Sequence, residues 1–251
     1  MSEETVYGVH AVRALLQRRP SAVQRLLLLA GRSDKRVQEL VELAQAHGLK
    51  VESRPLAELD ALAPGQVHQG VLARVTAAAA LDEDELLMRL DAAGRAPLLL
   101  VLDGVQDPHN LGACLRTADA AGADAVIVPR DRATGLTPVV RKVAAGAAET
   151  VAFVQVTNLA RFLRALKEQE VWIVGTDGEA ELVHHAADLK GPLALVLGAE
   201  GAGMRRLTRE TCDVVVRLPM LGAVESLNVS VAAGVMLYEA LRQREASAAS
   251  R

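Results

Sequence analysis

Two short aliphatic runs near the C-terminus, each followed by a loop with few bulky side chains, constrain the fold of this chain most strongly. The runs span residues 193–197 and 214–218, a length and composition typical of strands buried on both faces of a parallel sheet. The loops behind them contain Gly198, Gly201 and Gly203 in the first case, and Pro219, Gly222, Ser226 and Asn228 in the second. Both loops are therefore expected at the carboxyl edge of one sheet, where open α/β sheets bind ligands.

The glycines predict close approach between backbone and a small molecule, because glycine accepts positive φ and has no side chain. A side chain at Gly198 is accordingly expected to block that approach. The order G-x-x-G-x-G differs from the dinucleotide fingerprint G-x-G-x-x-G, and the chain has no G-x-x-x-x-G-K-[ST] motif. A nucleotide phosphate site is therefore disfavoured, while plain tight turns remain the alternative for either loop.

The C-terminal part alternates strands with helices from residue 98 onward. Expected strands are 98–103, 125–128, 151–156 and 171–175, besides the two runs above. Expected helices are 111–121, one opened by Thr137 and Pro138, one capped by Asn158, and a final helix at 229–242. This pattern predicts an α/β fold with about six mostly parallel strands and helices on both faces.

The N-terminal residues 1–76 predict a small α/β/α unit. Expected helices are 9–18, 34–46 capped by Ser33, and a short one after Pro55, with strands at 23–29, 50–53 and 70–75. An alanine run and the acidic cluster 82–85 indicate a linker that contains a helix. The predicted domains are thus 1–76 and 97–247, joined by a linker at 77–96.

Composition excludes several classes of protein. The 251 residues are 51% hydrophobic and 2% aromatic, so the core must consist of aliphatic side chains. Cys114 and Cys212 belong to no C-x-x-C or Cys/His cluster, which argues for small core residues, a reducing compartment and no structural zinc. With no signal pattern and no apolar run of membrane-spanning length, we expect a soluble cytoplasmic protein without membrane contact.

Charge gives little indication of the partner. The net charge of −3 does not suggest nucleic acid, and the small basic excess of residues 1–76 is weak evidence. Candidates for phosphate contact in that part are Arg13, Arg18, Arg19, Arg25, Lys35 and Arg36, and an ordinary solvated surface is the alternative reading.

Three segments, 102–129, 193–204 and 217–244, together resemble the three motifs of the SpoU/TrmH branch of the SPOUT methyltransferases. In addition, YGVHAVRALLQ at 7–17 and HQGVLARV at 68–75 are similar to the substrate-binding domain, of ribosomal-protein L30e type, found in members of this family. The resemblance covers nearly the whole chain, with all three motifs in the family's order.

The resemblance implies transfer of a methyl group from S-adenosylmethionine, without metal, to a guanosine ribose 2′-oxygen in 23S rRNA. A tRNA ribose is the alternative substrate. It further implies a trefoil knot in the C-terminal domain and an active site completed across a homodimer. The catalytic residues that it implies are Asn110, Arg116, Glu200, Ser226 and Asn228. The cofactor-binding residues that it implies are Gly198, Gly201, Leu218, Met220 and Leu227.

The family places Arg116 at the reacting hydroxyl, often as a proposed base. Because a guanidinium loses its proton only above pH ~12, use of the neutral form near pH 7 costs roughly 7 kcal/mol. A permanent cation that holds the adjoining phosphate and stabilises the developing alkoxide avoids this cost and is preferred. An ion pair with Asp119 on the helix surface is the alternative. Glu200 is expected to hold Arg116 or to shape the cofactor loop, with a solvated carboxylate as its alternative.

Overall fold

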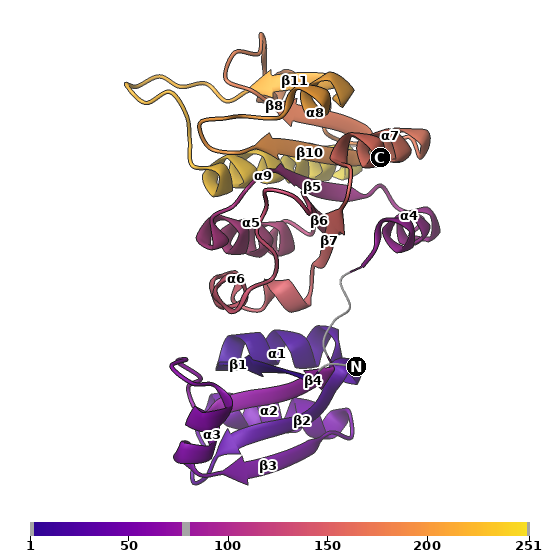
Figure 1. Cartoon of the computed structure of the whole chain (residues 1–251). Helices are drawn as coiled ribbons and strands as arrows, with labels where there is room; N and C mark the ends of the chain where they lie inside the picture. Colours follow the sequence, from indigo (N-terminus) through magenta and orange to yellow (C-terminus); the bar gives the residue numbers. More distant parts are fainter. Residues whose placement is uncertain (1–2, 77–80, 250–251) are drawn as a thin grey trace. The chain divides into compact units, whose positions relative to one another are not determined.

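Residues 3–76 and 81–249 are the part of the chain that the computed structural model describes. The chain divides into two units, one made of residues 1–79 with 145–150, the other of residues 80–144 with 151–251 (Figure 1). The alanine run at 77–80, part of the expected linker, lies outside the described residues. The helix within that linker groups with the second unit.

The first unit is a four-stranded sheet with the strand order β1-β4-β2-β3. Its strands are β1 (Glu3–Tyr7), β2 (Val23–Leu29), β3 (Lys50–Arg54) and β4 (Val71–Thr76). Its helices are α1 (Val9–Arg18), the 3₁₀ turn η1 (Pro20–Ala22), α2 (Lys35–Ala46) and α3 (Leu56–Leu62). Strand β4 is antiparallel to both β1 and β2, whereas β2 and β3 are parallel.

Two apolar clusters cover the two faces of this sheet. Helices α1 and α2 pack on one face around Leu15, Leu26 and Leu40, while α3 contributes Leu59 to a smaller cluster on the other face. One predicted cap is wrong, since Asp34 and not Ser33 caps α2. The Asp34 carboxylate accepts hydrogen bonds from the amides of Arg36 at 3.1 Å and Val37 at 3.4 Å. The other predicted helices and strands of this unit are confirmed, and β1 adds a strand that the pattern did not predict.

The second unit is built on a seven-stranded sheet whose strand pairs are all parallel. The strand order is β7-β6-β5-β10-β8-β11-β9. The strands are β5 (Leu98–Asp103), β6 (Ala125–Pro129), β7 (Ala152–Val156), β8 (Trp172–Thr176), β9 (Leu182–Val183), β10 (Leu193–Gly198) and β11 (Val214–Arg217). All six residues of β5 are buried, as a central strand with both faces covered requires. The predicted parallel α/β fold is confirmed.

Helices cover both faces of this sheet (Figure 1). The longer helices are α4 (Glu83–Ala92), α5 (Pro108–Ala120), α6 (Pro138–Ala144), α7 (Leu159–Glu168), α8 (Arg206–Thr211) and α9 (Val229–Ala249). The 3₁₀ turn η3 (His184–Ala186) completes this unit, whereas the 3₁₀ turn η2 (Ala147–Glu149) groups with the first unit. Helix α5 contacts both α6 and α9, whereas α4 and α7 share a core cluster with the sheet's other face. The trefoil knot concerns the path of the chain, which strand order does not decide, so it stays a prediction.

Two helix ends differ from the predicted ones by several residues. Helix α5 begins at Pro108 instead of Leu111, because Asp107 caps it through the amide of His109 at 3.0 Å and proline suits the first helical position. Helix α9 continues beyond Arg242 to Ala249, since residues 243–249 contain no glycine or proline. The short elements α8 and β9 were not predicted. The expected caps Thr137 and Asn158 are confirmed. The Val140 amide donates to the Thr137 hydroxyl at 3.3 Å, and the Arg161 amide donates to Asn158 Oδ1 at 3.0 Å.

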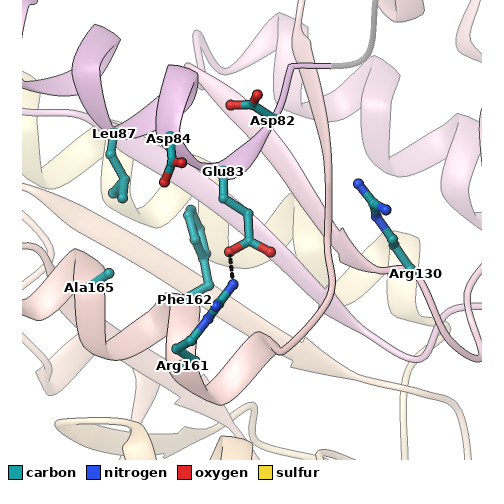
Figure 2. Close-up of a pocket in the computed structure, with 8 residues that line it drawn as sticks. All are labelled: Asp82, Glu83, Asp84, Leu87, Arg130, Arg161, Phe162 and Ala165. Atoms are coloured by element: carbon teal, nitrogen blue, oxygen red, sulfur yellow. Dashed lines mark hydrogen bonds and ion pairs between the residues drawn. The ribbon is translucent and has the colours of Figure 1, made fainter.

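Helix α4 is anchored to the second unit beside a shallow pocket of about 360 Å³ (Figure 2). Glu83 accepts a hydrogen bond from the amide of Thr157 at 2.8 Å and pairs with Arg161 at 2.5 Å, as Figure 2 shows for the latter. Leu86 and Leu90 of the same helix are buried in the core. The linker helix is therefore a structural part of the second unit.

The two cysteines are core residues, as predicted. Cys114 is buried in α5, and its burial raises the thiol pKa to about 12. Cys212 is partly buried, and burial raises its pKa to about 11. Neither thiol forms a disulfide in the structure, and both stay protonated near neutral pH.

Candidate active site

Three side chains, one from each of the three motifs, meet at the carboxyl edge of the parallel sheet. Asn110 lies in the first turn of α5, Glu200 in the loop after β10, and Asn228 directly before α9. The Asn228 amide nitrogen donates to Glu200 Oε1 at 2.7 Å and to Asn110 Oδ1 at 2.9 Å. Asn110 Nδ2 donates to the same Glu200 oxygen at 3.2 Å. The predicted meeting of the two loops is confirmed at this cluster, here called the Asn–Glu–Asn cluster.

Helix termini hold the cluster in place. Asn228 caps α9, because its Oδ1 accepts from the Ser230 amide at 2.9 Å and from the Ser230 hydroxyl at 2.6 Å. Glu200 Oε1 also accepts from the Val229 amide at 3.2 Å, which places a carboxylate at the positive end of the longest helix. Glu200 Oε2 accepts no hydrogen bond from the described residues, so it is available to a ligand.

The loop after β10 folds back on itself. The amide of Ala199 donates to the Gly203 carbonyl at 3.1 Å, and the Gly203 amide donates to the Ala199 carbonyl at 2.9 Å. Gly201 and Gly203 have φ of 75° and 66°, which favours glycine at both positions. A β-carbon at Gly198 would lie 2.1 Å from the Gly203 carbonyl carbon. The expectation for Gly198 therefore needs correction, because a side chain there would first break the loop's own packing.

A buried ion pair that the sequence analysis missed ties this loop to β5. Asp103, the last residue of β5, is 1% exposed. Its Oδ1 lies 2.6 Å from both Nε and Nη2 of Arg205, and its Oδ2 accepts from the Arg205 amide at 2.9 Å. An Asp at the end of a buried strand and an Arg just after a glycine loop were visible in the sequence. The sequence did not show that these two residues pair, because more than a hundred residues separate them.

The segment between β11 and α9 offers free backbone groups. Residues 219–227 have no regular secondary structure, and their backbone forms none of the hydrogen bonds found among the described residues. Leu218, Met220 and Leu227 are half-buried, whereas Leu221 is 98% exposed. Unpaired N–H and C=O groups next to half-buried leucines suit a ligand with a polar amino-acid part and an apolar part. The segment thus fits S-adenosylmethionine, which the resemblance implies.

Two predicted catalytic residues lie outside the Asn–Glu–Asn cluster. Arg116 is exposed on α5, and within the described part of the chain it forms no hydrogen bond and no ion pair, either with Glu200 or with Asp119. Ser226 is exposed in the loop before α9 and is likewise without a hydrogen bond among the described residues. Glu200 therefore holds the two asparagines and not Arg116. The Arg116 guanidinium is free to meet a substrate.

Other kinds of site are not found in the described ranges 3–76 and 81–249. These residues contain no group of three or more His, Cys, Asp or Glu side chains that could hold a metal ion. Their helices also include none with the length and hydropathy needed to cross a bilayer. The pocket of Figure 2 is lined by none of the predicted site residues. The Asn–Glu–Asn cluster and its two loops are thus the candidate active site.

Two family models match this chain, one over each of its two parts. The model of the SpoU rRNA methylase family matches residues 97–238, and that of RNA 2′-O ribose methyltransferase substrate binding matches residues 5–80. The 23S rRNA (guanosine-2′-O-)-methyltransferase RlmB of Pseudomonas syringae pv. tomato is 58% identical over 243 residues, covering 97% of each chain.

Solved structures of methyltransferases resemble this chain over most of its length or over about two thirds of it. The SpoU methyltransferase AviRb from Streptomyces viridochromogenes, in complex with the cofactor AdoMet, has 26% identity and a TM-score of 0.76, with 97% of this chain and 91% of that one covered. The A. aeolicus TrmH/SpoU tRNA modifying enzyme has 31% identity and a TM-score of 0.56, but covers 66% of this chain and 86% of its own. The resemblance inferred from the motifs is confirmed, and the chain belongs to the SpoU rRNA methylase family.

Proposed function

We propose that this protein methylates the ribose 2′-oxygen of a guanosine in 23S rRNA with S-adenosylmethionine as methyl donor. The Asn–Glu–Asn cluster carries the proposal, since it joins all three motifs of a methyltransferase family in one site. The rRNA substrate is favoured because the RlmB relative matches 97% of this chain, whereas the tRNA modifying enzyme covers 66%. The reaction belongs to the cytoplasm, where rRNA is made.

Mapping of 2′-O-methyl groups in total RNA tests this proposal. A strain that lacks the gene is expected to lose one methylated guanosine in 23S rRNA and to regain it when the wild-type gene is restored. Restoration of an Arg116→Ala variant serves as the matched control and should leave the site unmethylated. Loss of a tRNA methyl group with intact 23S rRNA would replace the proposal by the tRNA alternative.

The proposed roles follow from where the side chains lie. Gly198, Gly201, Leu218, Met220 and Leu227 would hold S-adenosylmethionine through the two loops, and the bound cofactor supplies an electrophilic methyl group. The harder task is activation of the ribose hydroxyl, a poor nucleophile until its developing negative charge is stabilised. Arg116 meets that charge as a cation.

The remaining predicted residues orient the ribose and its phosphate. Asn110 and Asn228 are fixed by Glu200 and have amide groups that can hydrogen bond hydroxyl and phosphate oxygens. Ser226 precedes Asn228 by two residues and is exposed, and its hydroxyl can donate or accept a hydrogen bond. Positioning of both reactants in this way lowers the entropy cost of the reaction.

We further propose a homodimer that pairs through α9. Val231, Val235 and Tyr238 are 52%, 37% and 50% exposed, and their spacing of four and three residues places them on one helix face. An apolar stripe of this kind is typical of a covered surface.

Val235→Asp is expected to produce monomers by sedimentation at micromolar concentration and to abolish methylation. The same substitution at Val139, 42% exposed on α6, should leave the dimer intact. A fully active monomeric wild type would contradict the dimer.

Residues 1–76 are proposed to deliver RNA to the methyltransferase domain at 97–247. A fragment that begins at residue 81 is expected to bind S-adenosylmethionine with unchanged affinity but to lose most methylation of 23S rRNA, because positioning contacts are gone. The fragment must retain α4, since Leu86 and Leu90 are 2% and 9% exposed. A fragment from Arg95 lacks both, which removes roughly 3–6 kcal/mol of apolar burial. Undiminished rRNA methylation by the residue-81 fragment would exclude the delivery role.

A further inference from the structure

A row of three cations crosses three neighbouring strands of the first unit. Arg25 on β2 lies in register with Arg74 on β4 on one side and with Lys50 on β3 on the other. At a strand spacing of about 4.8 Å the row spans about 10 Å. The side chains of Arg25 and Lys50 are 48% and 74% exposed, and Arg74 donates to the Thr5 hydroxyl at 3.1 Å. Side chains of like charge thus lie directly opposite one another, an arrangement that destabilises a sheet by itself.

A β-bulge in β2 produces this alignment. Val23 pairs with Val75, but Arg25 and not Gln24 is the partner of Arg74, so β2 has one extra residue at this point. Without the bulge, Gln24 would lie opposite Arg74, and Arg25 would turn toward the core face. Bulges commonly re-aim a side chain next to functional surfaces. The backbone of β2 is therefore adapted to align cations.

The surroundings of the row are polar and positively charged. Helix α3 packs over the other end of this face, where Leu27 and Leu72 are buried. Beside the row, Glu52 is 10% exposed, lies 2.9 Å from the Lys50 ammonium and 3.7 Å from the Arg25 guanidinium, and pairs with Arg54. The hydrogen bonds from Lys50 and Arg54 hold the pKa of Glu52 below its ordinary value. One carboxylate thus faces several cations, and the row keeps a positive excess.

We propose that the row formed by Arg74, Arg25 and Lys50 binds consecutive phosphates of the substrate's RNA backbone. This inference rests on the proposed function, because it assigns the RNA contact of residues 1–76 to one face of their sheet. Aligned guanidinium and ammonium groups with a neighbouring threonine hydroxyl are the donors that typically contact phosphates. A protein partner would need an apolar centre, which the row lacks.

Binding of full-length variants to a protein-free 23S rRNA transcript tests the proposal over a series of salt concentrations. Arg25→Gln/Arg74→Gln is expected to weaken binding by about tenfold or more at 0.1 M salt. It should also reduce the slope of log K against log salt by about 0.7–0.9 for each lost contact. The matched control is Arg164→Gln/Lys190→Gln, which removes the same charge from two exposed positions outside the candidate active site and should change affinity less than threefold. An unchanged far-ultraviolet circular dichroism spectrum, together with an unchanged thermal unfolding profile, verifies that each variant is folded.

A second variant gives the opposite sign, which no loss of folding can imitate. Glu52→Gln keeps the size of the side chain but removes the negative charge that contacts Lys50 and Arg25 beside the row. It is expected to tighten RNA binding severalfold, since the cations then face the phosphates without a competing carboxylate. Weaker or equal binding by Glu52→Gln, together with equal salt slopes for the double variant and its control, would overturn the proposal.

The test separates this proposal from the proposed function. Phosphate contacts do not depend on base sequence, so the same salt series is repeated with an unrelated single-stranded RNA. Failure of the wild type to methylate 23S rRNA would refute the proposed function, yet a smaller slope for the double variant on both RNAs would still support the row. Equal slopes for wild type and double variant, with methylation intact, would refute the row alone.

Discussion

Replacement of Arg116 by alanine is expected to lower the single-turnover rate of methylation by about 10²–10³, the typical loss for one preorganised electrostatic donor. Affinity for S-adenosylmethionine should barely change, because Arg116 is exposed on α5 and is proposed to face the ribose. Arg116→Lys should keep measurable activity, since an ammonium retains the charge but loses the bidentate geometry. The two variants together distinguish the contribution of the positive charge at position 116 to the rate from that of the guanidinium's bidentate geometry.

A pH series on wild type and the lysine variant distinguishes a cation from a base. If Arg116 were the base, the rate would rise about tenfold per pH unit, and lysine, with an ordinary pKa of ~10.4, would move that rise to lower pH. A permanent cation predicts no such rise from this residue for either protein. Normal methylation by the alanine variant would exclude both roles, because the side chain would then be dispensable.

Asp103→Asn is expected to destabilise the second unit by about 2–3 kcal/mol. Loss of one partner of a buried ion pair costs roughly 3–5 kcal/mol, and the Arg205 side chain is 44% exposed, which reduces the penalty. The matching fall in Tm is about 5–10 °C for a unit of this size. Because Arg205 follows the loop with Gly198, affinity for S-adenosylmethionine should fall as well.

The structure offers a matched control for this second prediction. Asp177 pairs with Arg209 at 2.8 Å in the same unit, and the arginine is similarly exposed at 48%, but the Asp177 carboxylate is 27% exposed. Asp177→Asn should therefore cost less than about 1 kcal/mol. Trp172, the chain's single tryptophan, lies in β8, so its fluorescence in urea reports unfolding of the second unit. Equal midpoints for both variants would show that burial of Asp103 adds nothing.

Regular patterns predicted most of the long elements. The helix at 9–18 and the strand at 23–29 have the bounds that their apolar spacing indicated, because each must bury one face or stripe locally. The start of α5 was misjudged, although Asp107 and Pro108 formed a readable cap. The short strand β9 has two residues, too few to carry a period, and it exists because β11 provides a partner.

The three residues of the Asn–Glu–Asn cluster were predictable from the sequence, but their hydrogen bonds to one another were not. Motif position selected Asn110, Glu200 and Asn228. Of the three readings given for Glu200, the one in which it holds Arg116 is wrong, because Glu200 accepts hydrogen bonds from the two asparagines instead. The reason for glycine at Gly198 also changed, from ligand approach to the turn's own backbone. Such details depend on which loop atoms become neighbours after the sheet has formed.

The sequence by itself determined the parallel α/β fold, the family and the three side chains of the Asn–Glu–Asn cluster, because periodicity and motifs are readable along the chain. Only the tertiary structure decided the buried pair of Asp103 with Arg205 and the alignment of Arg25 with Arg74 and Lys50. Both depend on register between segments far apart in sequence. A single bulge shifts that register by one residue and turns a side chain to the opposite face, which no local pattern records.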